Sequence, residues 1–325
     1  MKDNKLHVVT GAAGFIGSQL VDLLLEQNHR VFGIDNFVRG EEAHIAAARK
    51  NKNFAFAKVD CANEQAVLAT MEQYGRNADM IWHLAANSDI GTGGSDPSID
   101  LRDTFMTTYC VAQACRKFGI RKLAFASTSA IYGDHGPIAL HENVGPLFPI
   151  SNYGAMKLAS EACLTALSEA ALDRLWLFRF PNVIGGRATH GVIHDFLDRL
   201  AKAPDELRVL GNGSQCKPYL YVNDLLSAVF MIVEKASERV NCFNIGPSDI
   251  GVTVREIAEI VVSKASPGAR IVYGSEDRGW VGDVPRFHYA IDKLLALGWR
   301  PQCPTSLDAV ERAVSVQVAE RMAIA

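Results

Sequence analysis

Near its start the chain reads Leu6-His7-Val8-Val9-Thr10-Gly11-Ala12-Ala13-Gly14-Phe15-Ile16-Gly17. Leu6–Thr10 predicts a buried strand, the three glycines have G-x-x-G-x-x-G spacing, and a helical pattern follows through about Gln27. A strand, a glycine turn and a helix in this order let the backbone approach a pyrophosphate at a helix N-terminus. The stretch therefore predicts a dinucleotide site at the start of a parallel sheet.

The next part of the chain repeats this alternation of short strands and longer helical patterns. The further predicted strands are Arg30–Ile34, Phe54–Val59, Asp79–Leu84 and Lys122–Ala126, with a glycine-rich loop at Gly91–Gly94 and a long helix over about 99–118. Such alternation is typical of an α/β fold, here a Rossmann-type doubly wound parallel sheet. The ligand crevice of such a sheet lies beyond the carboxyl ends of its strands.

After about residue 180 the predicted strands become fewer and shorter, for example Tyr219–Val222 and Arg270–Tyr273, and Thr253-Val254-Arg255-Glu256 reads as a capping box. No flexible linker separates this part from the first. We therefore expect a dinucleotide-binding domain over 1–180, its sheet completed by later segments, and a smaller interleaved C-terminal α/β substrate lobe over 181–325.

Composition excludes several classes of function. The net charge of −3 over 325 residues gives no reason to expect a nucleic-acid partner. The N-terminus lacks a signal-peptide pattern, and Val222–Val233 is too short and too polar to span a bilayer, so we expect no membrane partner and a cytoplasmic location. Seven cysteines without a C-x-x-C pair predict no metal site.

Two acidic residues end predicted strands. Asp35 ends the second strand, where a carboxylate can bind the adenosine ribose and repel a 2′-phosphate, which favours NAD over NADP. The nearby Arg39 is the alternative, because an arginine can receive that phosphate instead. Asp60 ends the third strand, and either a contact with the adenine amino group or a helix N-cap explains it.

Tyr153 and Lys157 lie four residues apart in Ser151-Asn152-Tyr153-Gly154-Ala155-Met156-Lys157. In a helix both side chains project from one face. A phenol with a pKa near ~10 is a poor base at neutral pH, and a neighbouring ammonium favours its phenolate. The spacing alone also occurs on many solvated helices, so its meaning depends on the rest of the chain.

Together these segments resemble the extended class of the short-chain dehydrogenase/reductase superfamily, and particularly its nucleotide-sugar epimerases and dehydratases. The resemblance covers nearly the whole chain. Its motifs here are Gly11–Gly17, Asp35-Asn36, Asp60, His83-Leu84-Ala85-Ala86, Ser127–Gly133, Tyr153–Lys157 and Arg179-Phe180-Pro181-Asn182.

The resemblance implies a role for each motif. Tyr153 is expected to be the general base, Lys157 to bind the nicotinamide ribose and lower the Tyr153 pKa, and Thr128 to hydrogen-bond the reacting sugar oxygen, with Ser127 supporting. The implied cofactor is NAD. Its expected contacts are Gly11, Gly14, Phe15, Ile16, Gly17, Asp35, Asn36, Asp60, Cys61, Leu84, Ala85, Ala86, Tyr153 and Lys157.

The resemblance also implies contacts with a nucleotide diphosphate. These are Asn182, Arg187, Lys217, Arg278 and Asp283, although each cation can equally be an ordinary surface charge. Lys217 stands where many relatives place an arginine, and lysine cannot form the bidentate fork. Thr104 stands where relatives usually have an asparagine, which suggests a local rearrangement near the nicotinamide. Phe287 favours a plain hexose or uronic acid over an N-acetyl sugar.

The reaction is narrowed by the residues that follow Thr128. Related 4,6-dehydratases carry an Asp-Glu pair there and related decarboxylases commonly keep the Glu, whereas this chain has Ser129 and Ala130. Without an acid for elimination, the expected reaction is C4 epimerisation of a UDP-hexose, as in the UDP-glucose 4-epimerase group. The alternatives are another enzyme of the family (a decarboxylase, dehydratase, reductase or 2-epimerase) or a non-catalytic dinucleotide-sensing protein. By resemblance we expect a homodimer formed through helices 108–118 and 153–170.

Overall fold

The structure is a computed structural model that describes residues 4–136, 138–276 and 288–324. The chain divides into two compact units, each built from three segments. Unit 1 consists of Met1–Ile131, Ser151–Arg179 and Val233–Phe243, and unit 2 of Tyr132–Ile150, Phe180–Ile232 and Asn244–Ala325. The chain therefore passes back and forth between the units rather than completing one before the other.

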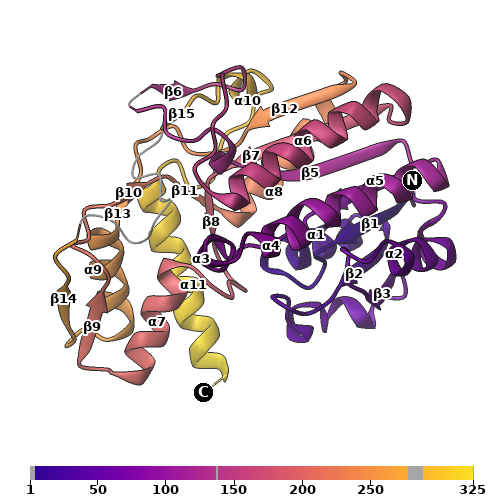
Figure 1. Cartoon of the computed structure of the whole chain (residues 1–325). Coiled ribbons are helices and arrows are strands. Elements are labelled where there is room, and N and C mark those ends of the chain that lie inside the picture. The colour runs from indigo at the N-terminus through magenta and orange to yellow at the C-terminus, as the bar shows by residue number, and fades with distance from the viewer. Residues whose placement is uncertain (1–3, 137, 277–287, 325) are drawn as a thin grey trace. The chain divides into compact units, whose positions relative to one another are not determined.

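Unit 1 is built on a seven-stranded sheet with the order β12-β7-β5-β4-β1-β2-β3 (Figure 1). The strands are β1 (Leu6–Thr10), β2 (Arg30–Asp35), β3 (Phe54–Lys58), β4 (Met80–His83), β5 (Lys122–Thr128), β7 (Arg174–Phe180) and β12 (Val240–Asn244). From β3 through β5 every neighbouring pair is parallel. Because β1 lies between β2 and β4, the strand order reverses at β1, and a crevice at its carboxyl end follows.

Helices cover this sheet with apolar faces. The helices are α1 (Phe15–Glu26), α2 (Glu64–Thr70), α5 (Thr107–Phe118) and α6 (Asn152–Ala170). The strand residues Phe32, Ile81 and Leu123 form one buried cluster with Cys110 of α5 and Leu164 of α6. Burial of this apolar surface fixes α5 and α6 side by side on the sheet (Figure 1).

Two predictions for the segment after β4 are wrong. The expected glycine-rich loop contains a short helix, α3 (Ile90–Ser95), because the side chain of Asp89 caps it by accepting from Thr92 N at 3.1 Å. The expected continuous helix over 99–118 is divided into α4 (Pro97–Asp100), a π-helical segment η4 (Leu101–Met106) and α5. The segment η4 is thus a π turn between two α-helical segments. Such π turns occur frequently at functional sites.

Unit 2 contains parallel pairs of short strands and three long helices. The pairs are β8 (Asn182–Ile184) with β11 (Tyr219–Tyr221) and β9 (Glu206–Val209) with β14 (Arg270–Tyr273). The helices α7 (Val192–Lys202), α9 (Val254–Ala265) and α11 (Ser306–Ile324) share one apolar cluster. The predicted capping box is confirmed, since Thr253 and Glu256 bond each other's backbone at the start of α9.

The remaining elements are short, except for α8, a helix of 14 residues with a buried apolar face. They are β6 (Ala139–Leu140), β10 (Cys216–Lys217), β13 (Val252–Thr253), β15 (His288–Tyr289), α8 (Val222–Lys235), α10 (Asp292–Ala296), η1 (Glu42–Ile45), η2 (Ala48–Lys50), η3 (Met71–Gly75) and η5 (Ser129–Ile131). Within the described part of the chain, no helix is both long and apolar enough to cross a membrane. The predicted fold class, a doubly wound parallel α/β sheet with a smaller interleaved lobe, is confirmed.

Candidate active site

The glycine turn is packed so tightly that neither Gly11 nor Gly17 could carry a side chain without a clash. Gly11 has a left-handed φ of +71°, and a Cβ on Gly17 would lie 2.0 Å from the Gly11 carbonyl oxygen. Gly14 is the N-cap of α1 and supplies no side-chain cap. The N-terminus of α1, with Phe15 and Ile16 in its first turn, therefore presents bare backbone amides, which suit a pyrophosphate.

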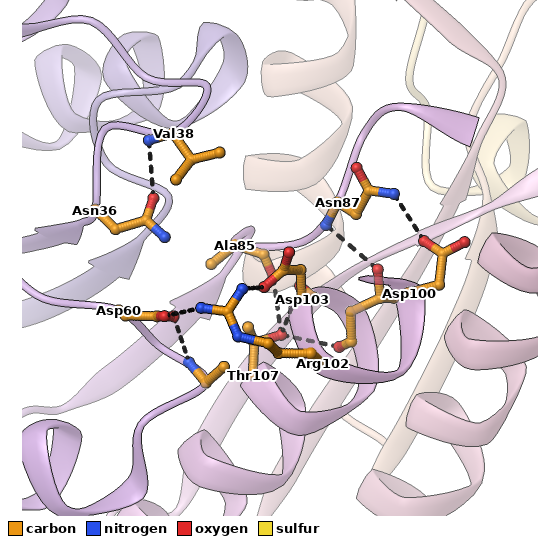
Figure 2. A network of polar contacts seen from close by, with 11 residues as sticks. Asn36, Val38, Asp60, Ala85, Asn87, Asp100, Arg102, Asp103 and Thr107 are labelled. Atoms are coloured by element: carbon orange, nitrogen blue, oxygen red, sulfur yellow. Dashed lines mark hydrogen bonds and ion pairs between the residues drawn. The ribbon is translucent and has the colours of Figure 1, made fainter. Parts of the chain in front are cut away.

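Asp35 has a structural role in addition to the predicted contact with a ribose. It is 7 % exposed, and its carboxylate accepts from the backbone amides of Ala13 (2.9 Å) and Phe37 (2.8 Å). The carboxylate oxygens keep lone pairs for a ribose hydroxyl. Asp35 thus fixes the glycine turn through its bond to Ala13. Asn36 next to it accepts from Val38 N at 3.0 Å (Figure 2).

Two arginines near this edge are held by carboxylates. Arg39, the alternative ligand for a 2′-phosphate, forms an ion pair with Asp89. Arg102 forms ion pairs with Asp60 and Asp103 (Figure 2). Because Arg39 already pairs with Asp89, it is a weaker candidate than Asp35 for contacting the adenosine ribose or its phosphate.

Asp60 lies beside an open cavity of about 530 Å³, which is lined by residues 60, 62–65 and 102. It accepts from Ala62 N at 2.9 Å. Its alternative interpretation as a helix N-cap is wrong, because Asn63 caps α2 by accepting from Ala66 N. The thiol of Cys61 is buried in the core and burial raises its pKa, so only the Cys61 backbone is available to a ligand.

The Leu84-Ala85-Ala86 segment is anchored to the end of β1. Thr10 Oγ1 accepts from the backbone amides of Leu84 and Ala85, each at 3.2 Å. The fully buried His83 bonds Thr10 Oγ1 at 2.7 Å and Thr108 Oγ1 at 3.1 Å. Burial lowers the pKa of His83 to about 3, so this ring is neutral and structural rather than a proton donor.

Tyr153, Lys157 and Thr128 are brought together at the start of α6 and the end of β5. Ser151 caps α6 by accepting from Gly154 N at 3.1 Å, which places Tyr153 in the first turn. Lys157 Nζ donates to the Ala126 carbonyl oxygen at 2.6 Å and lies 5.8 Å from the centroid of the Tyr153 ring. The Thr128 side chain lies near enough to the Tyr153 hydroxyl to lower its pKa.

Burial dominates the acid–base behaviour of this pair. It raises the pKa of Tyr153 to about 12, against the hydrogen bond from Thr128, which lowers it. Burial lowers the pKa of Lys157 to about 7, although the charges of Glu161 and Asp100 raise it. The protein alone therefore holds a neutral phenol, and a further positive charge beside the ring is needed to form the phenolate.

Sequence reasoning missed a buried ion pair behind the site. Arg179 at the end of β7 donates twice to Glu161, at 3.0 and 2.6 Å. Ser127, 1 % exposed, donates its hydroxyl to the same carboxylate, which makes it a supporting residue here. Glu161 lies one turn beyond Lys157 on the same helical face, which is the signal that could have found it.

The predicted diphosphate contacts lie in unit 2. Asn182 begins β8, Lys217 ends β10, and Arg187 has a left-handed φ of 60° with its backbone amide donating to Glu320 at 3.2 Å. Arg278, Asp283 and Phe287 lie outside the described residues. In the parts of the chain that are described, no three His, Cys, Asp or Glu side chains are grouped as metal ligands.

Comparison with known proteins agrees with this geometry. A sequence model described as the NAD dependent epimerase/dehydratase family matches residues 7–246. A "Putative UDP-glucose 4-epimerase" of Methanocaldococcus jannaschii is 29 % identical over 91 % of this chain and 93 % of its own length. "UDP-glucuronic acid decarboxylase 1" of Danio rerio is 28 % identical over 93 % of this chain and 70 % of its own length.

The same comparison extends to solved structures. A crystal structure of UDP-galactose 4-epimerase is 33 % identical and superposes with a TM-score of 0.83, covering 98 % of this chain and 99 % of that one.

Proposed function

Because this chain belongs to the NAD-dependent epimerase/dehydratase family, we propose that it is an isomerase, a nucleotide-sugar 4-epimerase that inverts C4 of a UDP-hexose through a transient 4-keto sugar. The substrates that fit best are UDP-glucose and UDP-galactose, or UDP-glucuronate. The observation that carries the proposal is the buried Tyr153–Lys157–Thr128 cluster, which is followed by Ser129 and Ala130 in η5 with no acid.

Each residue of the cluster has one task in this reaction. Tyr153 takes the proton of the C4 hydroxyl as the C4–H bond breaks, and returns it when that bond re-forms on the other face. Thr128 donates to or accepts from the sugar oxygen and so aligns it with Tyr153. Lys157 binds the nicotinamide ribose and stabilises the phenolate with its charge. NAD⁺, held by these residues, would supply a reversible hydride acceptor for C4.

The geometry of unit 1 supports the cofactor contacts that we propose. We assign the pyrophosphate to the Gly11–Gly17 turn, the adenosine ribose to Asp35 and Asn36, and the adenine to Asp60 and the Cys61 backbone. The segment Leu84–Ala86 borders the same crevice. Asp35 and the occupied Arg39 support NAD over NADP.

The sugar nucleotide is assigned to the second half of the chain. We propose that residues 181–325 form the nucleotide-sugar-binding lobe, with Asn182, Arg187, Lys217, Arg278 and Asp283 as its contacts, while residues 1–180 bind NAD. We also propose a cytoplasmic homodimer formed through α5 and α6. Sedimentation equilibrium tests the oligomer, since a monomer at micromolar concentration contradicts it.

The test of the reaction uses UDP-glucose and UDP-glucuronate that carry deuterium at C4, incubated with the purified protein and NAD⁺ and read by NMR. An epimerase yields the C4 epimer of one of them with the deuterium still at C4. Loss of CO₂, migration of the label to C6 or net NADH release would instead identify a decarboxylase, dehydratase or reductase. Recovery of every substrate unchanged, with NAD⁺ bound, would leave a non-catalytic dinucleotide-sensing protein.

A further inference from the structure

Asp100, the last residue of α4, is a fully buried carboxylate to which the proposed reaction gives no task. Its Oδ1 accepts from Asn87 Nδ2 at 2.9 Å (Figure 2). No donor among the described residues forms a hydrogen bond with Oδ2. A buried carboxylate with an unsatisfied oxygen is costly, which makes a purely incidental role unattractive.

The position of Asp100 connects it to Tyr153. Its Oδ2 lies so close to Gly93 that a Cβ on that glycine would come within 1.9 Å of it. The Gly93 carbonyl oxygen accepts from Asn152 Nδ2 at 2.9 Å, and Asn152 immediately precedes Tyr153 on α6. Both α4 and η4 pack against α6. The Asp100 carboxylate is therefore connected through Gly93 and Asn152 to the first turn of α6, which carries Tyr153.

The charge of Asp100 acts on both members of that pair. It raises the pKa of Tyr153 and also that of Lys157. Burial raises the pKa of Asp100 itself, while hydrogen bonds from Asn87 and Thr104 lower it. The net result is a pKa above the usual range of a carboxyl, and the hydrogen bond from Asn87 offsets part of the cost of the charged form.

The other carboxylates around Asp100 each have an arginine partner. Asp103 of η4 pairs with Arg102, and Asp89, the N-cap of α3, pairs with Arg39.

On α6, Glu161 is bound twice by Arg179. Asp100 differs from these three acids, because within the described part of the chain it forms no ion pair with an arginine or lysine.

We propose that Asp100 is a positioning residue that keeps the Lys157 ammonium charged in its buried site, delays formation of the Tyr153 phenolate, and so sets the pH range in which the pair works. This inference rests on the proposed function. Asp100 acts through Lys157 and Tyr153 and has no contact of its own with the sugar.

The test is the pH–rate profile of Asp100→Asn, which removes the charge and keeps the shape. Without the negative charge both the phenol and the ammonium lose their protons at lower pH. The acid limb, which needs the phenolate, and the basic limb, which needs the ammonium, should therefore both move to lower pH by about one unit. Asp103→Asn is the matched control, since its charge is already paired, and its profile should coincide with that of the parent.

A second readout does not depend on turnover. The ultraviolet absorbance of the Tyr153 phenolate, isolated by subtracting a Tyr153→Phe background, can be titrated with NAD bound in the parent and in Asp100→Asn. The titration should move to lower pH in the variant by a similar amount. If the parent turns over no sugar nucleotide, the proposed function fails while this titration still decides the role of Asp100.

Other outcomes overturn the inference. The pH–rate profile and the phenolate titration of Asp100→Asn could both match the parent, while only KM, kcat or thermal stability changes. Asp100 would then serve only to hold Asn87 and the loop before α3. If Asp100→Asn does not fold, Asp100→Ser replaces it, and failure of both to fold also assigns Asp100 a structural role only.

Discussion

Asp35 accepts a hydrogen bond from the backbone amide of Ala13 at 2.9 Å, so the carboxylate that ends β2 holds the glycine turn that follows β1. We expect Asp35→Asn to weaken NAD binding by roughly 10- to 100-fold, because a charge-assisted bond within the turn is lost together with a ribose contact. NADP binding should not rise to the parent's NAD affinity, since the turn itself is loosened.

Titration calorimetry with both dinucleotides measures this effect. Glu26→Gln, at the exposed end of α1, is the control and should bind NAD like the parent. NAD affinity that is unchanged in Asp35→Asn would remove Asp35 from the cofactor site.

The glycine turn gives a steric prediction. In Gly17→Ala the new Cβ would lie 2.0 Å from the Gly11 carbonyl oxygen, so the turn must open. We expect a loss of about 2 kcal/mol or more in the free energy of unfolding, and loss of NAD binding. Gly94→Ala, also in a helix, meets no atom within 4 Å and should cost nothing. Urea unfolding compares the two, and equal stability of both variants would contradict the packing described.

The features that could be predicted from the sequence are those that depend on the spacing of residues close together in the chain. The strand–glycine–helix order and the four-residue step from Tyr153 to Lys157 both depend on neighbours in the chain, and both were predicted. The Arg179–Glu161 pair could not be predicted in the same way, because it requires β7 to lie next to β5 in the sheet. The burial of Asp100 could not be predicted either, because it depends on the packing of α4 and η4 against α6 and not on a local motif.

The buried pair of Arg179 and Glu161 should be costly to break. Glu161→Gln leaves a buried guanidinium without its counter-charge, and we expect a loss of about 3–5 kcal/mol in the free energy of unfolding. The double change Glu161→Leu with Arg179→Met should cost less than the single one.

The exposed pair of Arg121 and Asp173 provides the comparison, and Arg121→Gln should change the free energy of unfolding far less than Glu161→Gln, because water screens that pair. Urea unfolding measures the stability of both variants. A Glu161→Gln protein as stable as Arg121→Gln would show that the Arg179–Glu161 pair is not buried as described.

Lys157 makes stability depend on pH. Its pKa falls from 10.5 in the unfolded chain to about 7 in the fold, so below about pH 7 the fold must hold an ammonium that the unfolded chain solvates better. This penalty fades as pH rises toward 10.5, where both states carry the neutral amine. Relative to the parent, Lys157→Met should therefore lose roughly 3–4 kcal/mol between about pH 7 and pH 10, because each pH unit between the two pKa values contributes about 1.4 kcal/mol.

The measurement is the free energy of unfolding of the two proteins without cofactor across this pH range. The difference between them is the quantity that matters, because the other titrating groups then cancel. A difference that stays flat would mean that the Lys157 amine is not desolvated in the fold.

The central claim is that Tyr153 moves the proton in a reversible oxidation at C4, and Tyr153→Phe tests it most directly. The variant removes one hydroxyl and keeps the ring that packs at the start of α6. We expect kcat, measured by NMR on the UDP-hexose that the parent converts, to fall by at least ~10²-fold, with NAD affinity in calorimetry unchanged. Turnover within about tenfold of the parent, with NAD bound as before, would contradict the account.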